Sequence, residues 1–560
     1  MRNQVEYEWR LLILIFVLLA AVLGLIGRII YLGTIKHHFL LDQSNIRSVR
    51  EITIPVHRGI ITDRNGKPLA ISIPVASIWV NPKLFSAAKP KEETSLALLL
   101  ELPLKTIKNK ISGQKQREFV YLKRAIPLEK ANQILALHIP GVFLEKGYKR
   151  YYPEADAAAH VVGFTNIDDH GQEGLELAYD SWLQGIPGKT RVVKDRLGNT
   201  ITNLDVITKP QQGRDLMLSI DRRIQYLAYN ELKNIIEKYH AESGSVVVLA
   251  VKTGEVLAMA NMPSYNPNNR KGIPINNMRN RAVTDLFEPG STIKAFTIAN
   301  ALGSGKYNIN TLVNTNPGVL KVDGHLIYDD KHRNNKVLTV KGVLQKSSNI
   351  GVAKITLSLP SDSLLNLLRS VGFGQSTQSG FPGEAAGVLP DHLKWRQFVL
   401  ATLAFGYSIS ATPLQLAQAH AVIASGGLLR PVTFLKNDAL TPGAQVLPAK
   451  LCKQMMSLLE AVLDIGGTGT RAQIPGYRVA GKTGTAYIAS PAGGYYTDRY
   501  FANFVGIAPA SDPQLVIVVV IKNPRGSLYH GGQVAAPAFA NIMNGALRIL
   551  GIPLDDVDSL

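Results

Sequence analysis

The sequence predicts an α+β protein with an N-terminal transmembrane helix, and three observations lead to this prediction. A single uncharged apolar run lies near the N-terminus, at residues 11–27. Short, turn-rich apolar segments occupy residues 50–220. Beyond them, strand patterns stand on both sides of a helical block, and the later strands fall at 500–507 and 515–521. This order is typical of a mixed sheet with an inserted helical subdomain.

Composition narrows the class of protein further. The chain has 560 residues and is 46% hydrophobic, which excludes wholesale disorder and predicts two or more folded units. The only cysteine, Cys452, excludes an intrachain disulfide framework and any cysteine-based metal cage. A formal charge of +19 is spread along the chain without a basic tail, which favours a polyanionic neighbourhood such as a membrane or wall.

The apolar run predicts a membrane anchor. At about 1.5 Å per residue, residues 11–27 reach roughly 25 Å, near the lower limit for a spanning helix. Apolar character continues past Arg28, and Trp9 and Tyr31 occupy the positions of interfacial aromatics. A cleaved signal peptide is the alternative, but no small-x-small cleavage site follows the run. We therefore expect a short tail at 1–10 and a helix at 11–32, while the flanking charges leave its orientation open.

The remaining elements follow from turn and helix signals. Asn65-Gly66 predicts a hairpin, and residues 93–137 have helical spacing. Asp221 is a plausible cap for a helix that runs to about 240. Further strands are expected at 245–250 and 256–260, and further helices at 291–305, 340–372, 411–424 and 535–550.

The first candidate catalytic motif is Ser291-x-x-Lys294. Pro289-Gly290 forces a turn, so Ser291 begins an apolar helical run among unpaired amide donors, and Lys294 lies on the same face. A desolvated lysine can act as the general base for a serine. A capping serine beside a surface lysine is the ordinary interpretation, and the same spacing recurs at Ser86 and Ser112.

Two further motifs add polar groups suited to a substrate. Ser347-x-Asn349 places a hydroxyl and an amide on one short turn, where a helix cap is the ordinary interpretation. Lys482-Thr483-Gly484-Thr485 reads as a strand that presents an ammonium, hydroxyls and backbone amides to a carboxylate. Each pattern also occurs earlier in the chain, as Ser264-Tyr265-Asn266 and Lys252-Thr253-Gly254.

The order of the three motifs is more specific than any one of them. Ser-x-x-Lys, Ser-x-Asn and Lys-Thr-Gly occur at 291, 347 and 482, separated by 56 and 135 residues. This is the signature of penicillin-binding proteins and serine β-lactamases. A competing interpretation is a P-loop, because residues 476–483 fit Gly-x4-Gly-Lys-Thr. However, Gly484 stands where the helix of a P-loop should begin, so nucleotide binding is the remote alternative.

On these motifs the chain resembles the class B penicillin-binding proteins, specifically the division-specific (septal) peptidoglycan D,D-transpeptidases. The resemblance covers nearly the whole chain, and Asn349 together with Lys-Thr-Gly-Thr favours the septal over the elongation type. Further segments that carry it are Arg58-Gly-Ile-Ile-Thr-Asp-Arg-Asn-Gly, Arg150-Tyr-Tyr-Pro, Gly174-Leu-Glu176, Phe405-Gly-Tyr-Ser and Thr412-Pro-Leu-Gln-Leu-Ala.

The resemblance implies a fold and a division of the chain. An elongated β-rich pedestal, used for dimerisation or partner docking, would occupy 33–220. A penicillin-binding transpeptidase domain, an antiparallel sheet covered by helices with a helical subdomain, would occupy 221–560. The anchor would be a single pass of the inner membrane, with the N-terminus in the cytoplasm and the catalytic domain in the periplasm.

The resemblance also implies roles for the motif residues. Ser291 would attack the penultimate D-Ala of a stem pentapeptide, Lys294 would accept its proton, and Ser347 would relay protons. Asn349 would bind the stem-peptide amide, while Lys482 with Thr483, Gly484 and Thr485 would bind the substrate carboxylate. The backbone N–H groups of Ser291 and Thr485 would form the oxyanion hole.

β-Lactams would acylate the same serine, and no metal or cofactor would be needed. Expected partners are a lipid-II-polymerising SEDS-family glycosyltransferase, other divisome membrane proteins and the membrane, and no nucleic acid. A catalytically silent, wall-binding divisome scaffold is the alternative from another functional class.

Overall fold

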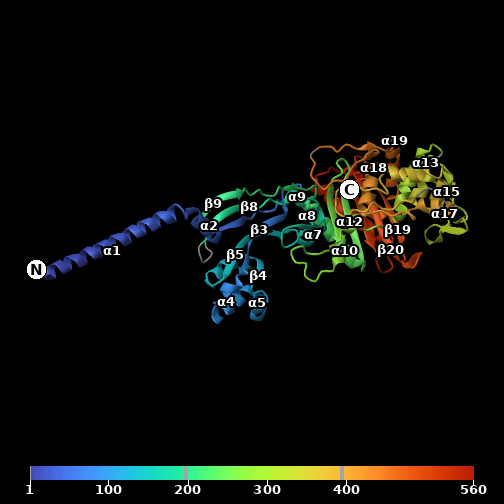
Figure 1. Cartoon of the computed structure of the whole chain (residues 1–560). Coiled ribbons are helices and arrows are strands. Elements are labelled where there is room, and N and C mark those ends of the chain that lie inside the picture. Colours follow the sequence, from blue (N-terminus) through green and yellow to red (C-terminus); the bar gives the residue numbers. More distant parts are fainter. Residues whose placement is uncertain (1, 195–199, 391–395, 438, 560) are drawn as a thin grey trace. The chain divides into compact units, whose positions relative to one another are not determined.

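The computed structural model describes residues 2–194, 200–390, 396–437 and 439–559. Two compact units are present, one formed by residues 1–57 with 185–212 and the other by residues 58–184 with 213–560. Figure 1 shows the elements of both, and each unit is described by itself.

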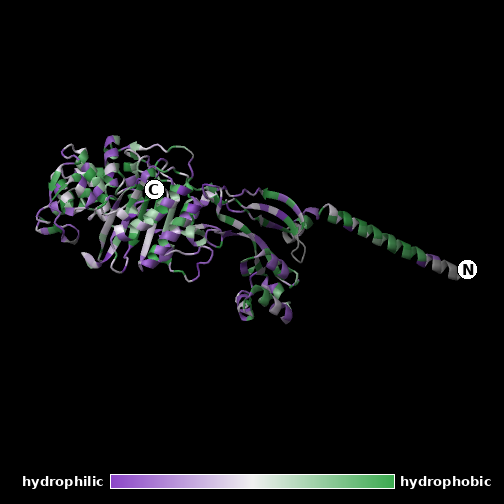
Figure 2. Ribbon diagram, turned by 180° about the vertical axis from the view of Figure 1, so that it is seen from behind, coloured by the Kyte–Doolittle hydropathy of each residue, from purple (hydrophilic) through white to green (hydrophobic). Residues whose placement is uncertain are grey.

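The first unit consists of the apolar helix and a small sheet. Helix α1 (Arg2–Gly33) contains a stretch, Glu8–Gly33, that is long and apolar enough to cross a membrane, and Figure 2 shows its apolar colouring. Its apolar side chains are exposed in the chain alone, as expected of an anchor that lipid surrounds. Helix α2 (His37–Ser48) leads to a three-stranded antiparallel sheet of β1 (Val49–Ile54), β8 (Gly188–Lys194) and β9 (Thr200–Thr208).

The N-terminal part of the second unit is built on a five-stranded sheet. The predicted hairpin is present, and Gly66 donates its N–H to Asp63 O at 3.0 Å in the turn. The strands are β2 (Ile61–Thr62), β3 (Pro68–Val80), β4 (Val120–Ile126), β5 (Val142–Tyr151) and β10 (Leu216–Met217). Shorter elements follow β5 along the chain: α7 (Ala155–Val162), β6 (Phe164–Thr165), β7 (Gly171–Glu173), α8 (Gly174–Ala178) and α9 (Asp180–Leu183).

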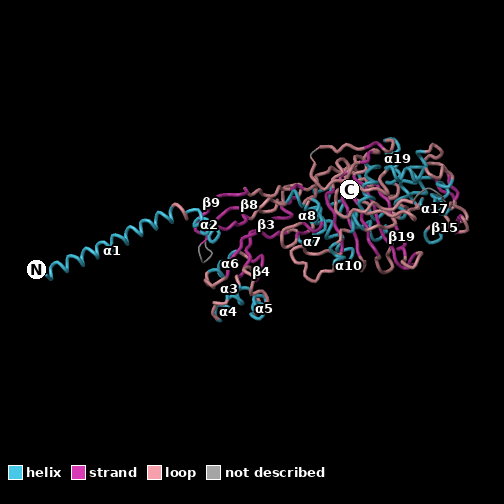
Figure 3. The backbone as a smooth tube through the Cα atoms, viewed as in Figure 1, coloured by secondary structure: helices cyan, strands magenta, loops and turns pink. Residues whose placement is uncertain are grey.

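The helical expectation for residues 93–137 is partly wrong. Helices α3 (Pro82–Phe85), α4 (Pro90–Leu100), α5 (Leu104–Ser112) and α6 (Leu128–Leu135) are present, but β4 interrupts them (Figure 3). Strand β4 forms because Val120 and Tyr121 pair with Val80 and Trp79 of β3. Long-range pairing of this kind decides strand formation and leaves little trace in local spacing.

A buried ionic network ties this part together. Arg58 Nε and Arg150 Nε each lie 2.6 Å from a different oxygen of Glu176, which is fully buried. Arg58 Nη1 also contacts Asp180 Oδ1 at 2.6 Å, and Arg58 Nη2 donates to Glu176 O at 2.7 Å. Three segments that the sequence analysis singled out therefore meet at one carboxylate.

The C-terminal part of the second unit has a five-stranded antiparallel sheet in the order β12-β11-β21-β20-β19. Its expected strands are confirmed: β11 (Ser243–Ala250), β12 (Val256–Met262), β19 (Ala480–Ala489), β20 (Tyr495–Ala508) and β21 (Leu515–Lys522). Helices α10 (Arg222–Lys238) and α20 (Gly531–Ile549) cover one face, and α18 (Pro413–Ala424) covers the other (Figure 1). The Asp221 side chain caps α10 as expected, accepting from Arg223 N at 3.0 Å.

A helical block with small hairpins is inserted between β12 and β19, so the mixed α+β class is confirmed. Its larger helices are α13 (Lys294–Gly303), α14 (Val340–Gln345), α15 (Asn349–Leu357), α16 (Ser363–Ser370), α17 (Gln397–Leu403) and α19 (Ala449–Glu460). Its short helices are α11 (Ile275–Met278), α12 (Arg281–Thr284), η1 (Gly290–Ile293), η2 (Asp330–His332) and η4 (Thr470–Ala472), and η5 (Val557–Ser559) follows α20. Its short strands are β13 (Leu312–Asn314), β14 (Val319–Val322), β15 (His325–Tyr328), β16 (Val337–Thr339), β17 (Leu428–Leu429) and β18 (Ala444–Gln445).

The ionic network yields a stability prediction. Glu176→Gln leaves two buried guanidinium groups without their shared carboxylate, so we expect the free energy of unfolding to fall by about 3–5 kcal/mol. Chemical denaturation of the full chain in detergent measures it. Lys83→Gln, which breaks the exposed pair with Glu118, is the matched control and should cost about 0–1 kcal/mol. Equal effects of the two substitutions would contradict the prediction.

Candidate active site

Ser291 lies on a tight turn against the edge of the sheet. It belongs to the 3₁₀ helix η1, and α13 begins at Lys294, so the first helical turn is tighter than the expected α-helix. Gly290 has φ +58°, and a Cβ on it would lie 3.0 Å from Thr485 O. A glycine is needed here because this turn must approach β19 closely. The Ser291 hydroxyl is part-exposed and makes no hydrogen bond to any described residue.

Lys294 is fully buried and points at the second motif. Its Nζ donates to Ser347 O at 2.6 Å, to Asn349 Oδ1 at 2.7 Å and to Ser347 Oγ at 3.1 Å. Burial lowers the pKa of Lys294 to about 7, while the negative charges of Asp329 and Asp330 act in the opposite direction. An amine with such a pKa is partly neutral at physiological pH and can accept a proton.

Ser347 connects two lysines. It lies between α14 and α15 with φ +56°, a conformation that residues other than glycine adopt mainly where the surroundings impose it. Its Oγ is 3.0 Å from Lys482 Nζ and 3.1 Å from Lys294 Nζ. Burial, followed by the charge of Lys294, holds the pKa of Lys482 well below its usual range. The hydroxyl is therefore placed to pass a proton between two amines that resist carrying charge together.

Asn349 begins α15 and fixes Lys294. Its Oδ1 accepts from the lysine, and its Nδ2 donates to Tyr328 O at 2.9 Å. The side chain thus has a positioning role that sequence reasoning did not identify, and the amide-binding role remains a prediction.

Asp329 is a further residue that the sequence analysis missed. Its Oδ1 accepts from Ser348 Oγ and from Ile350 N, both at 3.0 Å, so it holds the turn that carries Ser347. The same carboxylate supplies negative charge beside Lys294. Its sequence context, a doublet of aspartates after a short strand pattern, gives no local signal because its partners lie on another element.

The third motif lies on β19, the edge strand of the sheet. Lys482 is fully buried, and Thr483 Oγ1 contacts Thr468 Oγ1 at 2.9 Å. Thr485 Oγ1 accepts from Gly531 N at the start of α20, at 3.0 Å. The strand thus brings Lys482 to the second motif and lies against the nucleophile turn, while the substrate contacts of Thr483, Gly484 and Thr485 stay predictions.

Asn503 explains why position 484 is glycine. A Cβ at Gly484 would lie 2.2 Å from Asn503 Oδ1, and Asn503 Nδ2 donates to Pro289 O at 3.2 Å. One side chain therefore joins β20 to the turn before Ser291 and passes under β19. Sequence reasoning missed Asn503 because it belongs to no motif.

Glu288 was also missed as a functional neighbour of Ser291. Its Oε1 accepts from Ser408 N at 2.9 Å and from Tyr495 OH at 3.0 Å, and burial raises its pKa. The carboxyl group therefore joins the turn before the nucleophile to a loop and to the β19–β20 hairpin.

The P-loop alternative is wrong. Residues 480–489 form one continuous strand through Lys482 and Thr483, with no helix after them. A P-loop needs a helix N-terminus at that point to bind phosphate.

A serine on a tight turn against the strand of Lys482, together with two buried lysines that share a bridging hydroxyl, is the arrangement expected of a serine–lysine acyl-transfer site. Comparison with known proteins agrees. The family described as "Penicillin binding protein transpeptidase domain" matches residues 244–544, and the "Penicillin-binding Protein dimerisation domain" matches residues 53–218. The chain belongs to the penicillin-binding protein transpeptidase family.

Its relatives match over almost the whole length. A probable peptidoglycan D,D-transpeptidase PbpC of Pseudomonas aeruginosa is 43% identical over 99% of this chain and 97% of the relative. The peptidoglycan D,D-transpeptidase FtsI of Escherichia coli is 42% identical over 98% and 93%. Among solved structures, penicillin-binding protein 3 of Mycobacterium tuberculosis with aztreonam is 28% identical, with a TM-score of 0.70 over 90% of this chain and 98% of that one.

The pKa of Lys294 leads to a prediction for pH dependence. Since only the neutral amine accepts the proton of Ser291, the rate of acylation by penicillin should rise about tenfold between pH 6 and pH 8 and then level off. Stopped-flow measurement with a fluorescent penicillin gives the profile. Asp329→Asn removes a charge that raises this pKa, so its inflection should move to lower pH. A flat wild-type profile would contradict Lys294 as the base.

The contact between Gly484 and Asn503 leads to a second prediction. Gly484→Ala should slow acylation by at least about tenfold, since the new methyl group must displace Asn503 or the strand. In the double variant Gly484→Ala/Asn503→Ala the clash is gone, and part of the loss should be recovered. The acylation rate constant measures both, and strictly additive losses would show that the two positions do not interact.

Proposed function

We propose that this chain is a serine peptidoglycan D,D-transpeptidase that cross-links stem peptides during septal cell-wall synthesis. The observation that carries the proposal is the Ser347 hydroxyl, which lies 3.1 and 3.0 Å from the amines of two fully buried lysines, Lys294 and Lys482. The division-specific role is supported by the motif residues Asn349 and Lys-Thr-Gly-Thr and by the FtsI relatives.

Acylation begins with a proton transfer. Neutral Lys294 takes the proton of Ser291 Oγ as the oxygen attacks the carbonyl carbon of the penultimate D-Ala. The backbone N–H groups of Ser291 and Thr485 bind the developing oxyanion, a contribution of about 3–4 kcal/mol for each donor. The close approach of Gly290 to Thr485 O supports this arrangement, because it brings the two segments together.

Release of terminal D-Ala needs a proton on its nitrogen. Ser347 delivers it from the lysine pair, since its hydroxyl can accept from one amine while it donates onward. The acceptor amine of a second stem peptide then attacks the acyl-enzyme and loses its proton along the same route in reverse. The product is an amide cross-link, and Ser291 is restored.

The edge of the sheet suits an extended donor peptide. Strand β19 ends the sheet order, so a peptide can pair with its free side as an added strand. The substrate carboxylate would bind near Lys482, Thr483 and Thr485. Gly484 has no side chain that would project from the strand between them. A negative charge at this place would raise the lowered pKa of Lys482 and favour its ammonium form. β-Lactams present the same carboxylate and a strained amide to Ser291.

The architecture supports a membrane-bound division enzyme. We propose a cytoplasmic tail at 1–10, an inner-membrane anchor at 11–32, a pedestal at 33–220 and a periplasmic transpeptidase domain at 221–560. The apolar helix and the match to the dimerisation-domain family support this division. The pedestal would dock divisome membrane proteins, including a SEDS-family glycosyltransferase.

Labelling of membranes with fluorescent penicillin tests the proposal. Ser291→Ala should abolish the label, and Lys482→Ala should lower the acylation rate constant by about 10²–10⁴-fold because a buried proton-transfer partner is lost. The matched control is Lys346→Ala, whose exposed amine contacts Gly466 O and which should label like wild type. Undiminished labelling of Ser291→Ala would exclude this nucleophile and favour a catalytically silent scaffold.

Cross-linking itself needs a second measurement. Wild-type protein given a D-Ala-D-Ala donor and an amine acceptor should release D-Ala and form the amide product. Labelling without amide product would leave a penicillin-reactive protein that is not a transpeptidase, and would overturn the proposal.

A further inference from the structure

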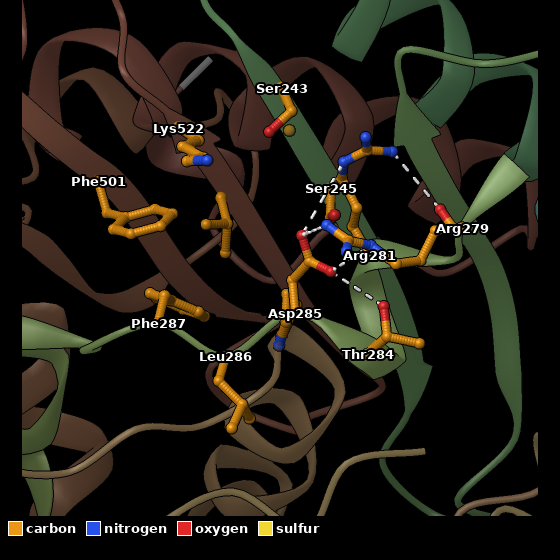
Figure 4. Close-up of a pocket in the computed structure, with 13 residues that line it drawn as sticks. Ser243, Ser245, Arg279, Arg281, Thr284, Asp285, Leu286, Phe287, Phe501 and Lys522 are labelled. Carbon is orange, nitrogen blue, oxygen red and sulfur yellow. Dashed lines mark hydrogen bonds and ion pairs between the residues drawn. The ribbon is translucent and has the colours of Figure 1, made fainter. Parts of the chain in front are cut away.

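A cavity of about 380 Å³ lies at one end of the main sheet, and neither Lys294 nor Lys482 lines it. Phe501, Lys522 and Ser243 are paired neighbours on β20, β21 and β11, so these three side chains form a row on one face. Helix α12 and the segment after it, residues 285–287, form the other side (Figure 4). The volume falls in the range of about 300–1,000 Å³ that is usual for ligand pockets. None of the lining residues belongs to the catalytic motifs.

The pocket contains one positive charge that no dedicated carboxylate balances. Asp285 is held by Arg279, with Nε at 2.9 Å from Oδ1 and Nη2 at 3.0 Å from Oδ2, and Thr284 donates to it as well. Lys522 pairs with Glu242. Arg281 Nε, in contrast, is 3.9 Å from Asp285 Oδ2, which is beyond hydrogen-bond length.

Arg281 is therefore a buried cation with incomplete compensation. Its guanidinium donates hydrogen bonds to backbone carbonyl oxygens, from Nη2 to Asn276 O at 2.7 Å and from Nη1 to Arg279 O at 3.5 Å. The residue is only 8% exposed. A buried charge whose nearest carboxylate lies 3.9 Å away and is shared with Arg279 is only partly compensated, so an anion that entered the pocket would be stabilised there.

Ser243 adds a hydrogen-bonding group to the same pocket. The residue is 6% exposed, its side chain lines the cavity, and its hydroxyl makes no hydrogen bond to any described residue. The hydroxyl oxygen is accessible from the cavity, so it is available to a bound group. In Figure 4, Ser243 and Arg281 flank the same space, while Phe287 and Phe501 form its apolar side.

We propose that this pocket binds the C-terminal carboxylate of a peptide that ends in an apolar residue. A planar guanidinium fork suits a carboxylate, and the single excess positive charge matches one carboxylate better than a doubly charged phosphate. The apolar wall, with Leu286 and Val520 beside the two phenylalanines, would receive the terminal side chain. A free amino acid fits less well, because its ammonium would lie among the cationic side chains of Arg279, Arg281 and Lys522. The nearby carboxylates of Asp285 and Glu242 already pair with Arg279 and Lys522.

The test uses full-length protein in detergent, with Ser291 first acylated by penicillin so that the active site is blocked. Calorimetry measures the binding of N-acetyl-leucine to this protein. Three related probes are measured in the same way for comparison: N-acetyl-leucine amide, free leucine and inorganic phosphate. We expect N-acetyl-leucine to bind at least tenfold more tightly than any of them. Equal binding of the amide would overturn a carboxylate site. Tighter binding of free leucine or of phosphate would overturn the peptide end as the ligand.

Three variants locate the binding. Arg281→Gln should weaken binding of N-acetyl-leucine at least tenfold, and Ser243→Leu should abolish it by filling the cavity. Asp285→Asn should strengthen binding, because it removes the carboxylate that lies 3.9 Å from Arg281. This opposite sign keeps the proposal testable if Arg281→Gln fails to fold. Unchanged binding in Ser243→Leu, or weaker binding in Asp285→Asn, would overturn the assignment.

Discussion

The catalytic part depends on the burial of two lysine amines around one serine hydroxyl. Desolvation disfavours the ammonium form of both Lys294 and Lys482, and their mutual repulsion adds to it for Lys482. Ser347 is the only side chain to which both amines donate among the described residues. The pKa of about 7 at Lys294 suits the proposed transfer of a proton between Ser291 and this amine.

The rest of the site can be understood as support for that arrangement. Asp329 holds the turn of Ser347 and keeps the pKa of Lys294 from falling further, and Asn349 fixes the amine by accepting from it. On the other side, Asn503 joins the turn of Ser291 to β20 beneath Gly484. In the proposed mechanism the motif residues carry the chemistry, while Asp329 and Asn503, which lie outside the motifs, hold them in place through hydrogen bonds.

Local signals predicted those elements that local physics specifies. The cap at Asp221, the hairpin around Gly66, a strand through Lys482 and helical structure within 340–372 were expected from their residues and are present. Strand β4 was missed because its pairing partner, β3, lies about forty residues earlier in the chain. The network of Arg58, Arg150 and Glu176 was visible only as three separate motifs, since nothing local in a sequence shows that distant charges share one buried carboxylate.

By itself, the sequence determined the class of the fold, the apolar anchor segment and which serine and lysines belong to one ordered set of motifs. These follow from hydrophobic patterning, turn chemistry and motif order, which are properties of neighbouring residues and of their sequence along the chain. The tertiary structure alone decided the lowered pKa values of the two lysines, the supporting roles of Asp329 and Asn503, and the incomplete compensation of the Arg281 charge. The reason is physical: pKa, hydrogen bonding and charge balance depend on burial and on groups brought together from distant segments, and only the folded chain defines both.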